Sequence, residues 1–501
     1  MTAPDGPREF AQAFRELLTW LQDGESGRSR RNEVVALVRD HLGEAGLAQS
    51  VVGTDLPPFE QVNLQAALNA WSAQPGRTVQ VRGLDLPPHF GPVSLRQLQH
   101  GDALPPVHLS APDLVDLPVG PGRTLACLKQ ALLLVEDGRG PYVLHLRGPQ
   151  RHEEPTLGLD VGGLSTQDAQ EVLRELAELR SSLNVYRGQV LELGYGSGGP
   201  SITFPVLPPT TRADVVLPEA VLRRIERHTV AIADHREVLR AAGQHLKRGV
   251  LLYGPPGTGK THTTRYVVQQ LAGSTVLMLS GQALGMIGLV AQLARDLQPA
   301  VVVLEDVDLV AEDRGHGPGP SPVLFELLDA MDGAAPDADL LFLLTTNRAD
   351  LLEPALAARP GRVDVAVEIG LPDASARRAL FGVYSRGVPL EIDGDQVDEV
   401  VQRTEGVTAS FVKELLRRAV LESLTEQEGP LERVTGAHVA RALDDLLDSA
   451  QSVTRALLGV PADQSGPVAL QPAGRASGGH LGWFPGRPGM VSELHLGLDD
   501  D

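Results

Sequence analysis

The chain has 501 residues, a formal net charge of −20 and a single cysteine. Its length allows about two to four domains, and no apolar run approaches the length that a membrane span needs. The negative charge would repel a phosphate backbone, which disfavours a nucleic-acid-binding protein. Cys127 alone cannot build a disulfide framework, and residues 1–10 lack the pattern of a secretory signal, so we expect a cytoplasmic protein.

Residues 1–148 contain no pattern that points to catalysis. We expect an amphipathic helix with Phe10 and Phe14 on its apolar face, and a second helix at 33–42. Leu-Pro-Pro occurs three times in this region, either as a degenerate repeat or as proline at loop ends; the uneven spacing favours loop ends. The sequence predicts a mostly helical α+β region of unknown role.

The segment 149–212 predicts a helix, a hairpin and a linker. Ser165 and Asp168 form a capping pair before an apolar stripe, which could pack in a core or on a partner subunit; a core is the simpler assignment. Two short apolar runs, 190–193 and 202–204, are separated by glycines and predict a hairpin.

From residue 213, buried strands alternate with helical stretches. The short apolar runs lie at 250–253, 275–279, 300–304 and 340–345. Such alternation gives a parallel sheet with helices on both faces, and ligands bind at the carboxyl ends of its strands. We therefore predict an α/β domain over 213–370.

The first of these strands runs into a glycine-rich turn. It matches the phosphate-binding P-loop pattern in every required position: Gly254, Pro255, Pro256, Gly257, Thr258, Gly259, Lys260 and Thr261. The glycines allow successive N–H groups to point at a triphosphate. Lys260 can reach the β- and γ-phosphates, and the Thr261 hydroxyl can ligate Mg²⁺. We include the next residue, His262, in the nucleotide-binding set.

Polar residues also follow two later strands. Glu305 and Asp306 come directly after the third strand, where one carboxylate can hold Mg²⁺ and the other can orient the attacking water. Asn347 ends the fourth strand and could bond both that water and the γ-phosphate. Arg359 and Arg362 lie on a stiff turn and suit the stabilisation of transition-state charge.

These motifs, in this order, resemble the AAA family of ATPases. The resemblance rests on the glycine loop, the acidic strand end, Thr345-Thr346-Asn347-Arg348 and Arg359-Pro360-Gly361-Arg362, and it covers roughly half of the chain. It implies ATP and Mg²⁺ as cofactors, a P-loop NTPase domain followed by a helical lid at 371–450, and ATP hydrolysis. Four predicted short helices, at 374–384, 396–403, 409–424 and 436–447, are consistent with this lid. It also implies a ring, usually a hexamer, in which Arg359 and Arg362 act on the neighbouring subunit's ATP.

Two departures from the family pattern matter. The acids occur as Glu305 then Asp306, the reverse of the usual order, so the Mg²⁺ ligands would be Thr261 and Glu305 and the base would be the shorter Asp306. In addition, the loop that grips protein in threading members corresponds here to Met286, Ile287 and Gly288, without an aromatic ring.

The leading functional hypothesis is an ATP-driven enzyme that remodels or unfolds a protein client selected by the N-terminal region. The alternative is a nucleotide-gated scaffold with negligible hydrolysis, and a nucleic-acid motor is disfavoured by charge. Residues 451–501, rich in Gly, Pro and Ala, predict a disordered tail.

Overall fold

The computed structural model describes residues 25–85, 93–101, 107–148, 156–196, 199–308, 326, 329, 331, 338–348, 363–426 and 430–448. All of them belong to one compact unit, Met1–Val460. The predicted first helix with Phe10 and Phe14, the turn carrying Arg359 and Arg362, and the predicted tail lie outside the described residues. No helix among the described residues combines the length and apolarity that crossing a membrane requires.

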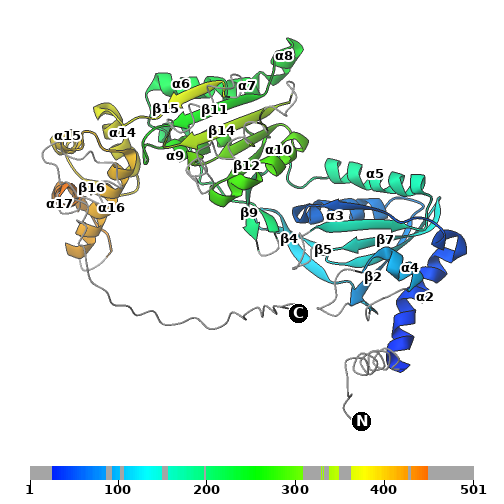
Figure 1. Cartoon of the computed structure of the whole chain (residues 1–501). Helices are drawn as coiled ribbons and strands as arrows, with labels where there is room; N and C mark the ends of the chain where they lie inside the picture. Colours follow the sequence, from blue (N-terminus) through cyan, green and yellow to red (C-terminus); the bar gives the residue numbers. More distant parts are fainter. Residues whose placement is uncertain are drawn as a thin grey trace, which may run out of the picture. The chain divides into compact units, whose positions relative to one another are not determined.

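The N-terminal region is built on a six-stranded antiparallel sheet (Figure 1). In spatial order its strands are β1 (Val52–Leu56), β8 (Leu157–Gly162), β7 (Gly140–Arg147), β6 (Ala131–Asp137), β2 (Thr78–Asp85) and β3 (His108–Ser110). Its helices are α2 (Glu25–Leu47), α3 (Gln61–Ser72), α4 (Leu95–His100) and α5 (Thr166–Ser182). Both faces are covered, because apolar residues of β6 pack alternately with α2 and α4 and with α3 and α5.

This region is α+β, as predicted, but the prediction that it is mostly helical is wrong, because it is built on the six-stranded sheet and the β4–β5 pair, β4 (Leu114–Gly120) and β5 (Arg123–Leu128). The run 131–135 shows why: it is buried on both faces, so it lacks the alternation of polar and apolar residues that marks a half-buried strand. A short apolar run of this kind cannot be told from a buried helix by periodicity.

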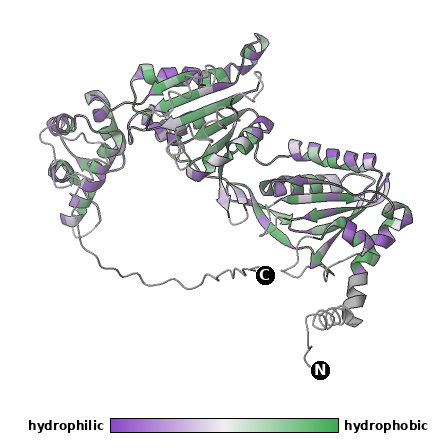
Figure 2. Ribbon diagram, in the orientation of Figure 1, coloured by the Kyte–Doolittle hydropathy of each residue, from purple (hydrophilic) through white to green (hydrophobic). Residues whose placement is uncertain are grey.

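The second sheet has seven strands and is parallel except at one edge. Its spatial order is β10 (Gly199–Thr203), β9 (Val190–Gly196), β12 (Thr275–Leu279), β13 (Ala300–Leu304), β14 (Leu340–Thr346), β11 (Arg248–Tyr253) and β15 (Val365–Glu368). Helix α10 (Ile287–Asp296) packs on one face, and α6 (Glu219–His228) and α9 (Lys260–Gln270) pack on the other. Shorter helical pieces are η2 (Arg212–Asp214), α7 (Val230–Asp234), α8 (Arg236–Ala241) and η3 (Gly281–Met286). Figure 2 shows the strands of this sheet as a green, apolar layer.

The predicted hairpin of residues 190–204 is confirmed, and it has a second role. Strand β9 pairs with β10 in antiparallel fashion and with β12 in parallel fashion, so the hairpin extends the P-loop sheet by two strands. The β9 residues Leu191 and Leu193 share one hydrophobic core with Phe59 and Cys127 of the N-terminal region and with Val302 of the P-loop sheet.

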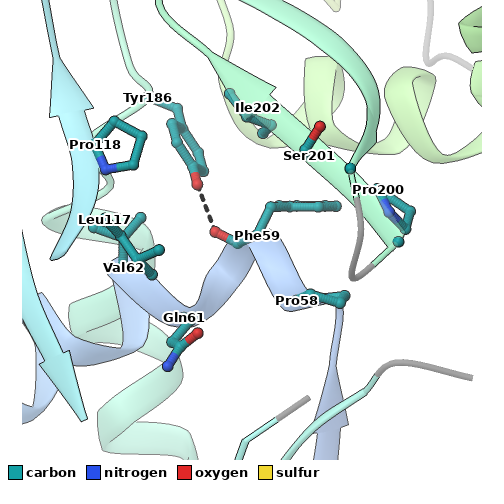
Figure 3. Close-up of a pocket in the computed structure, with 12 residues that line it drawn as sticks. Pro58, Phe59, Gln61, Val62, Leu117, Pro118, Tyr186, Pro200, Ser201 and Ile202 are labelled. Carbon is teal, nitrogen blue, oxygen red and sulfur yellow. Dashed lines mark hydrogen bonds between the residues drawn. The ribbon is translucent and has the colours of Figure 1, made fainter. Parts of the chain in front are cut away.

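A pocket of about 350 Å³ lies beside this hairpin (Figure 3). On one side are η1 (Pro58–Glu60) and the start of α3, and on the other side is β10. The Tyr186 hydroxyl donates to the carbonyl of Phe59 and so ties the residues before β9 to the N-terminal region. A two-stranded sheet, β4 (Leu114–Gly120) and β5 (Arg123–Leu128), borders the same core.

The four helices predicted after residue 373 are all present. They are α14 (Ala374–Tyr384), α15 (Gly394–Arg403), α16 (Ala409–Glu426) and α17 (Gly436–Leu447), and they enclose a hydrophobic core of their own. Two short strands, β16 (Leu390–Glu391) and β17 (Val434–Thr435), pair in parallel between them. Asp373 begins the first of these helices by accepting a hydrogen bond from the backbone N–H of Ala376.

Candidate functional site

The glycine-rich turn joins the carboxyl end of β11 to the amino end of α9. Gly254, Gly257 and Gly259 have φ angles of 143°, 77° and 106°, which residues with a Cβ atom rarely adopt. At Gly254 the requirement is also steric, because a Cβ atom would lie 2.3 Å from the carbonyl oxygen of Ile369. The turn therefore has the backbone conformation that the P-loop pattern predicts.

Lys260 is buried in this turn, with 6% of its surface exposed. Its Nζ donates to the carbonyl oxygens of Gly254 at 2.8 Å and Pro255 at 2.9 Å. Burial lowers the pKa of the ammonium group, while the charges of Asp306 and Asp308 oppose that lowering. The lysine is thus held between its own loop and the acids that follow β13.

The loop after β13 is bonded to the end of β14. The backbone N–H of Asp306 donates to Thr345 Oγ1 at 3.0 Å, and Asn347 Nδ2 donates to Asp306 Oδ1 at 3.3 Å. Asp306 has a φ angle of 51°, a left-handed conformation that is uncommon for a residue other than glycine and is often found at functional sites. The structure thus brings together Asp306, the predicted base, and Asn347, the predicted partner of the attacking water and the γ-phosphate.

Glu305 lies in different surroundings from its neighbour. Burial raises the pKa of its carboxyl group, Arg265 of α9 opposes this, and the charges of Asp306 and Glu192 add to it. Its Oε1 is buried and has no hydrogen-bond partner within the part of the chain that the structure describes. An orphaned carboxylate oxygen near α9, the helix that carries Thr261, fits a Mg²⁺ ligand.

Asp308 is a residue of this site that the sequence analysis missed. Its Oδ1 accepts from Thr346 Oγ1 at 2.9 Å and from the backbone N–H of Asn347 at 3.1 Å, and 6% of its surface is exposed. The signal was present in the sequence, because Asp308 is the third acid after a buried strand, two residues beyond Asp306.

The helices after residue 373 contact the glycine-rich turn. The backbone N–H and the hydroxyl of Ser410, in the first turn of α16, both donate to the carbonyl oxygen of Gly257, at 3.0 and 3.2 Å. Beside this contact lies a pocket of about 370 Å³ that the sequence analysis also missed. Its apolar wall includes Val216, Leu217, Val221, Leu380 and Ala409, with Thr258 of the turn at its border.

The remaining predicted residues in the described part of the chain differ in how far they are buried. Thr261 is half-buried in the first turn of α9. His262 is exposed, and its Nε2 lies 3.1 Å from the carbonyl oxygen of Asp214. Met286 and Ile287 are core residues with 6% and 1% exposure, so the prediction that these side chains could grip a client is contradicted by their burial. Their apolar character, which suggested a gripping loop, serves the packing of α10 on the sheet.

No group of three or more His, Cys, Asp or Glu residues within the described ranges could hold a metal ion by itself. Mg²⁺ does not need such a group, because it is usually held by one or two protein ligands together with substrate phosphates and water. The carboxyl edge of the sheet therefore offers a phosphate-binding turn, a lysine, a pair of acids with different surroundings and an amide, next to a mostly apolar pocket.

Comparisons with known proteins agree with this geometry. Residues 250–371 match the model of the ATPase family associated with various cellular activities (AAA). The ATP-dependent zinc metalloprotease FtsH of Mycobacterium tuberculosis strain H37Rv is 34% identical over 275 residues, which are 52% of this chain and 35% of that protein. FtsH 3 of Sphaerobacter thermophilus is 32% identical over 323 residues, 62% of this chain and 64% of that protein.

The chain thus spans between 35% and 64% of the length of these two relatives. Among solved structures, the AAA domain of FIGL-1 in complex with ADP is similar at 23% sequence identity and a TM-score of 0.41, over 51% of this chain and 93% of that one. The family match, the glycine-rich turn and the two polar strand ends all fall in one part of the chain. Residues 250–371 are therefore an AAA domain and belong to the ATPase family associated with various cellular activities.

Proposed function

We propose that the chain binds ATP with Mg²⁺ at the edge formed by β11, β13 and β14 and hydrolyses it to ADP and phosphate. The observation that carries the proposal is the hydrogen bond from Asn347, just after β14, to Asp306, in the loop after β13. Strand β14 lies between β13 and β11, the strand that leads into the P-loop. A base and an amide at this position can orient one water molecule against a phosphate group bound by Lys260.

Each residue has a separate role in this proposal. The P-loop N–H groups and Lys260 bind the phosphates, and the Asp306 carboxylate accepts the proton of the attacking water. Thr261 and Glu305 hold Mg²⁺, which neutralises phosphate charge when it is bound. The pocket between Leu217 and Ala409 takes the nucleoside, so the helices after residue 373 act as a lid.

We further propose that the protein works as a ring, usually a hexamer in this family, that remodels a protein client. Arg359 and Arg362 would then complete the site of the neighbouring subunit, and a monomer would hydrolyse ATP slowly. Protease activity, which the name of the FtsH relatives states, is not part of the proposal because the chain contains no His-Glu-x-x-His sequence. The limits 1–148, 149–212, 213–370, 371–450 and 451–501 remain our proposal for the domains.

The first prediction concerns Lys260→Ala and Asp306→Asn. We expect both variants to lose ATP turnover by about 100-fold or more, because each removes a group that acts on the reacting phosphate. Lys260→Ala should also weaken nucleotide binding in calorimetry, whereas Asp306→Asn should keep it. Exposed Lys129, which follows β5 in the N-terminal region, provides a control, since Lys129→Ala removes the same charge outside the P-loop and its neighbouring strands. Turnover at the wild-type rate in Lys260→Ala would falsify the proposal.

A nucleotide-gated scaffold with negligible hydrolysis is the second candidate. The short side chain of Asp306, with one oxygen already bonded to Asn347, is the observation that favours it. Phosphate release from the assembled wild-type protein distinguishes the two, because a scaffold would bind ATP without turnover. An Asp306→Asn variant loaded with ATP is also the form with which to capture a client.

A further inference from the structure

The loop after β13 and the end of β14 are joined by a set of hydrogen bonds around one buried carboxylate. Besides the bond from Asp306 to Thr345, the backbone N–H of Val307 donates to the Thr345 carbonyl at 3.0 Å. Asp308 Oδ1 accepts two further bonds, from Thr346 Oγ1 and from the backbone N–H of Asn347. The two strand ends are thereby fixed to each other at three consecutive positions of β14 and its continuation.

The hydrogen bonds of Asp308 Oδ1 come from β14 and Asn347, although the charge of Asp308 also acts on Lys260. Its carboxylate is buried, and its Oδ1 is used by β14 and not by the P-loop. The Thr346 side chain that it accepts from is fully buried and itself accepts from the backbone N–H of Arg348 at 3.0 Å. Asp308 therefore fixes the backbone on both sides of Asn347.

The consequence concerns the side chain of Asn347. Its amide lies 3.3 Å from Asp306 Oδ1, which is near the upper limit for a hydrogen bond and so tolerates little displacement. Without the carboxylate of residue 308, the backbone N–H of Asn347 would lose its acceptor and the buried Thr346 hydroxyl would lose its partner. The amide would then no longer be held beside the base.

We propose that Asp308 is a positioning residue, which holds Asn347 against Asp306 for the hydrolysis of ATP; this rests on the function proposed above. The contribution is made through hydrogen-bond acceptance, so it differs from that of a Mg²⁺ ligand or a base. A neutral residue of the same shape should retain most of it.

The experiment compares Asp308→Asn with Asp308→Ala. Asparagine retains a carbonyl oxygen at the position of Oδ1 and removes the charge, whereas alanine removes both. We expect Asp308→Ala to lower kcat by about 100-fold, with the Kd for a non-hydrolysable ATP analogue changed by less than about threefold. Asp308→Asn should retain kcat within about fivefold of the wild type.

A double-mutant cycle with Asn347→Ala shows whether Asp308 acts through Asn347. In the Asn347→Ala background, Asp308→Ala should lower kcat by less than about twofold. Effects that multiply in the double variant would overturn the proposal, as would equal losses for Asp308→Asn and Asp308→Ala. Loss of analogue binding together with turnover in Asp308→Ala would also overturn it.

If the wild type binds ATP and does not hydrolyse it, the proposed hydrolysis is wrong, but the positioning role of Asp308 can still be tested. Hydrogen exchange provides that test. The backbone amide of Asn347 should exchange faster in Asp308→Ala than in the wild type or in Asp308→Asn. Unchanged exchange in a folded Asp308→Ala protein would contradict the positioning role whatever the enzymatic activity.

Discussion

Lys260 illustrates how much of this site depends on single residues. Its ammonium group already makes two hydrogen bonds, to the carbonyls of Gly254 and Pro255. In the proposed function these bonds are exchanged for bonds to phosphate oxygens, which are stronger because the acceptor is then charged as well as the donor. The burial that lowers the pKa of this lysine also leaves it poorly hydrated, so the gain on meeting a phosphate is larger than at an exposed site.

A matched pair of glycines tests the contact between the turn and α16. Gly257 and Gly259 both have positive φ, so alanine at either position should cost about 1–3 kcal/mol in backbone strain. Only at Gly257 would the new Cβ meet Ser410, at 2.8 Å from its Oγ; at Gly259 nothing lies within 4 Å. We expect thermal unfolding to show a larger loss of stability for Gly257→Ala, by about a further 1–3 kcal/mol.

Ser410→Gly completes this test. It removes the hydroxyl and the Cβ that the new methyl group would contact, so it should restore part of the stability lost by Gly257→Ala and none of that lost by Gly259→Ala. An equal response of the two alanine variants to Ser410→Gly would show that α16 does not rest on the turn as described.

At the scale of elements, the segment from η3 into α10 has a buried side and an almost bare exposed side. Met286 and Ile287 are buried, while Gly281, Gln282, Gly285 and Gly288 are exposed. Three of these four exposed residues have no side chain with which to hold a polypeptide. The client of the proposed ring is therefore better sought at the N-terminal region than at this loop.

Substitutions on α10 test this division. Ile287→Ala should lower the free energy of unfolding by about 2–5 kcal/mol, because it opens a cavity in a packed core. Gly288→Ala should leave stability unchanged or raise it by up to about 1 kcal/mol, since a Cβ at this helical position meets nothing within 4 Å. Urea unfolding checks both, and a small effect of Ile287→Ala would mean that this stretch is not core.

Elements that short sequence patterns specify could be predicted, whereas features that depend on contacts between distant residues could not. The strand before Gly254, the turn itself and the helices at 374–384 and 436–447 are specified by short patterns and were predicted with the right bounds or nearly so. The pairing of β9 with β12 was not predicted, because it joins residues far apart in the chain, and no local pattern encodes a partner.

The site shows the same limit. Glycines, lysine and acids at fixed spacing identified the P-loop and the pair after β13. By contrast, Val216 and Leu217 precede the P-loop in the chain and Ala409 follows it by about 150 residues. These three residues line one pocket only because the tertiary fold brings them together. Met286 and Ile287 misled for a related reason: an apolar pair looks alike in a sequence whether it faces a channel or a core.

At the scale of the whole molecule, stability should depend on pH through His145 in β7. This side chain is fully buried, neither ring nitrogen has a hydrogen-bond partner among the described residues, and burial with the nearby charge of Arg147 lowers its pKa to about 3. An unfolded histidine has a pKa of about 6.5, so below that pH the unfolded state binds one proton more. Acid therefore destabilises the fold through this group, over the range from about pH 6.5 to about 3.

The measurement compares the wild type with His145→Gln at pH 7 and pH 5. The wild type should lose about 2 kcal/mol more of its unfolding free energy between these values, because glutamine does not titrate. Trp71, buried in the core on the other face of the same sheet, reports the unfolding by fluorescence if Trp20 and Trp483 are replaced by Phe. Parallel pH curves for the two proteins would contradict the assignment.

The extension of the P-loop sheet by β9 and β10 bears on how this protein can be divided for experiments. A fragment that starts at residue 213, where the sequence suggests a boundary, would leave β12 as an open sheet edge and uncover Leu277 beneath it. Unpaired edges with apolar neighbours are prone to aggregate. A shortened version intended for purification should therefore start before Tyr186, and a failed preparation from residue 213 would say nothing about enzymatic competence.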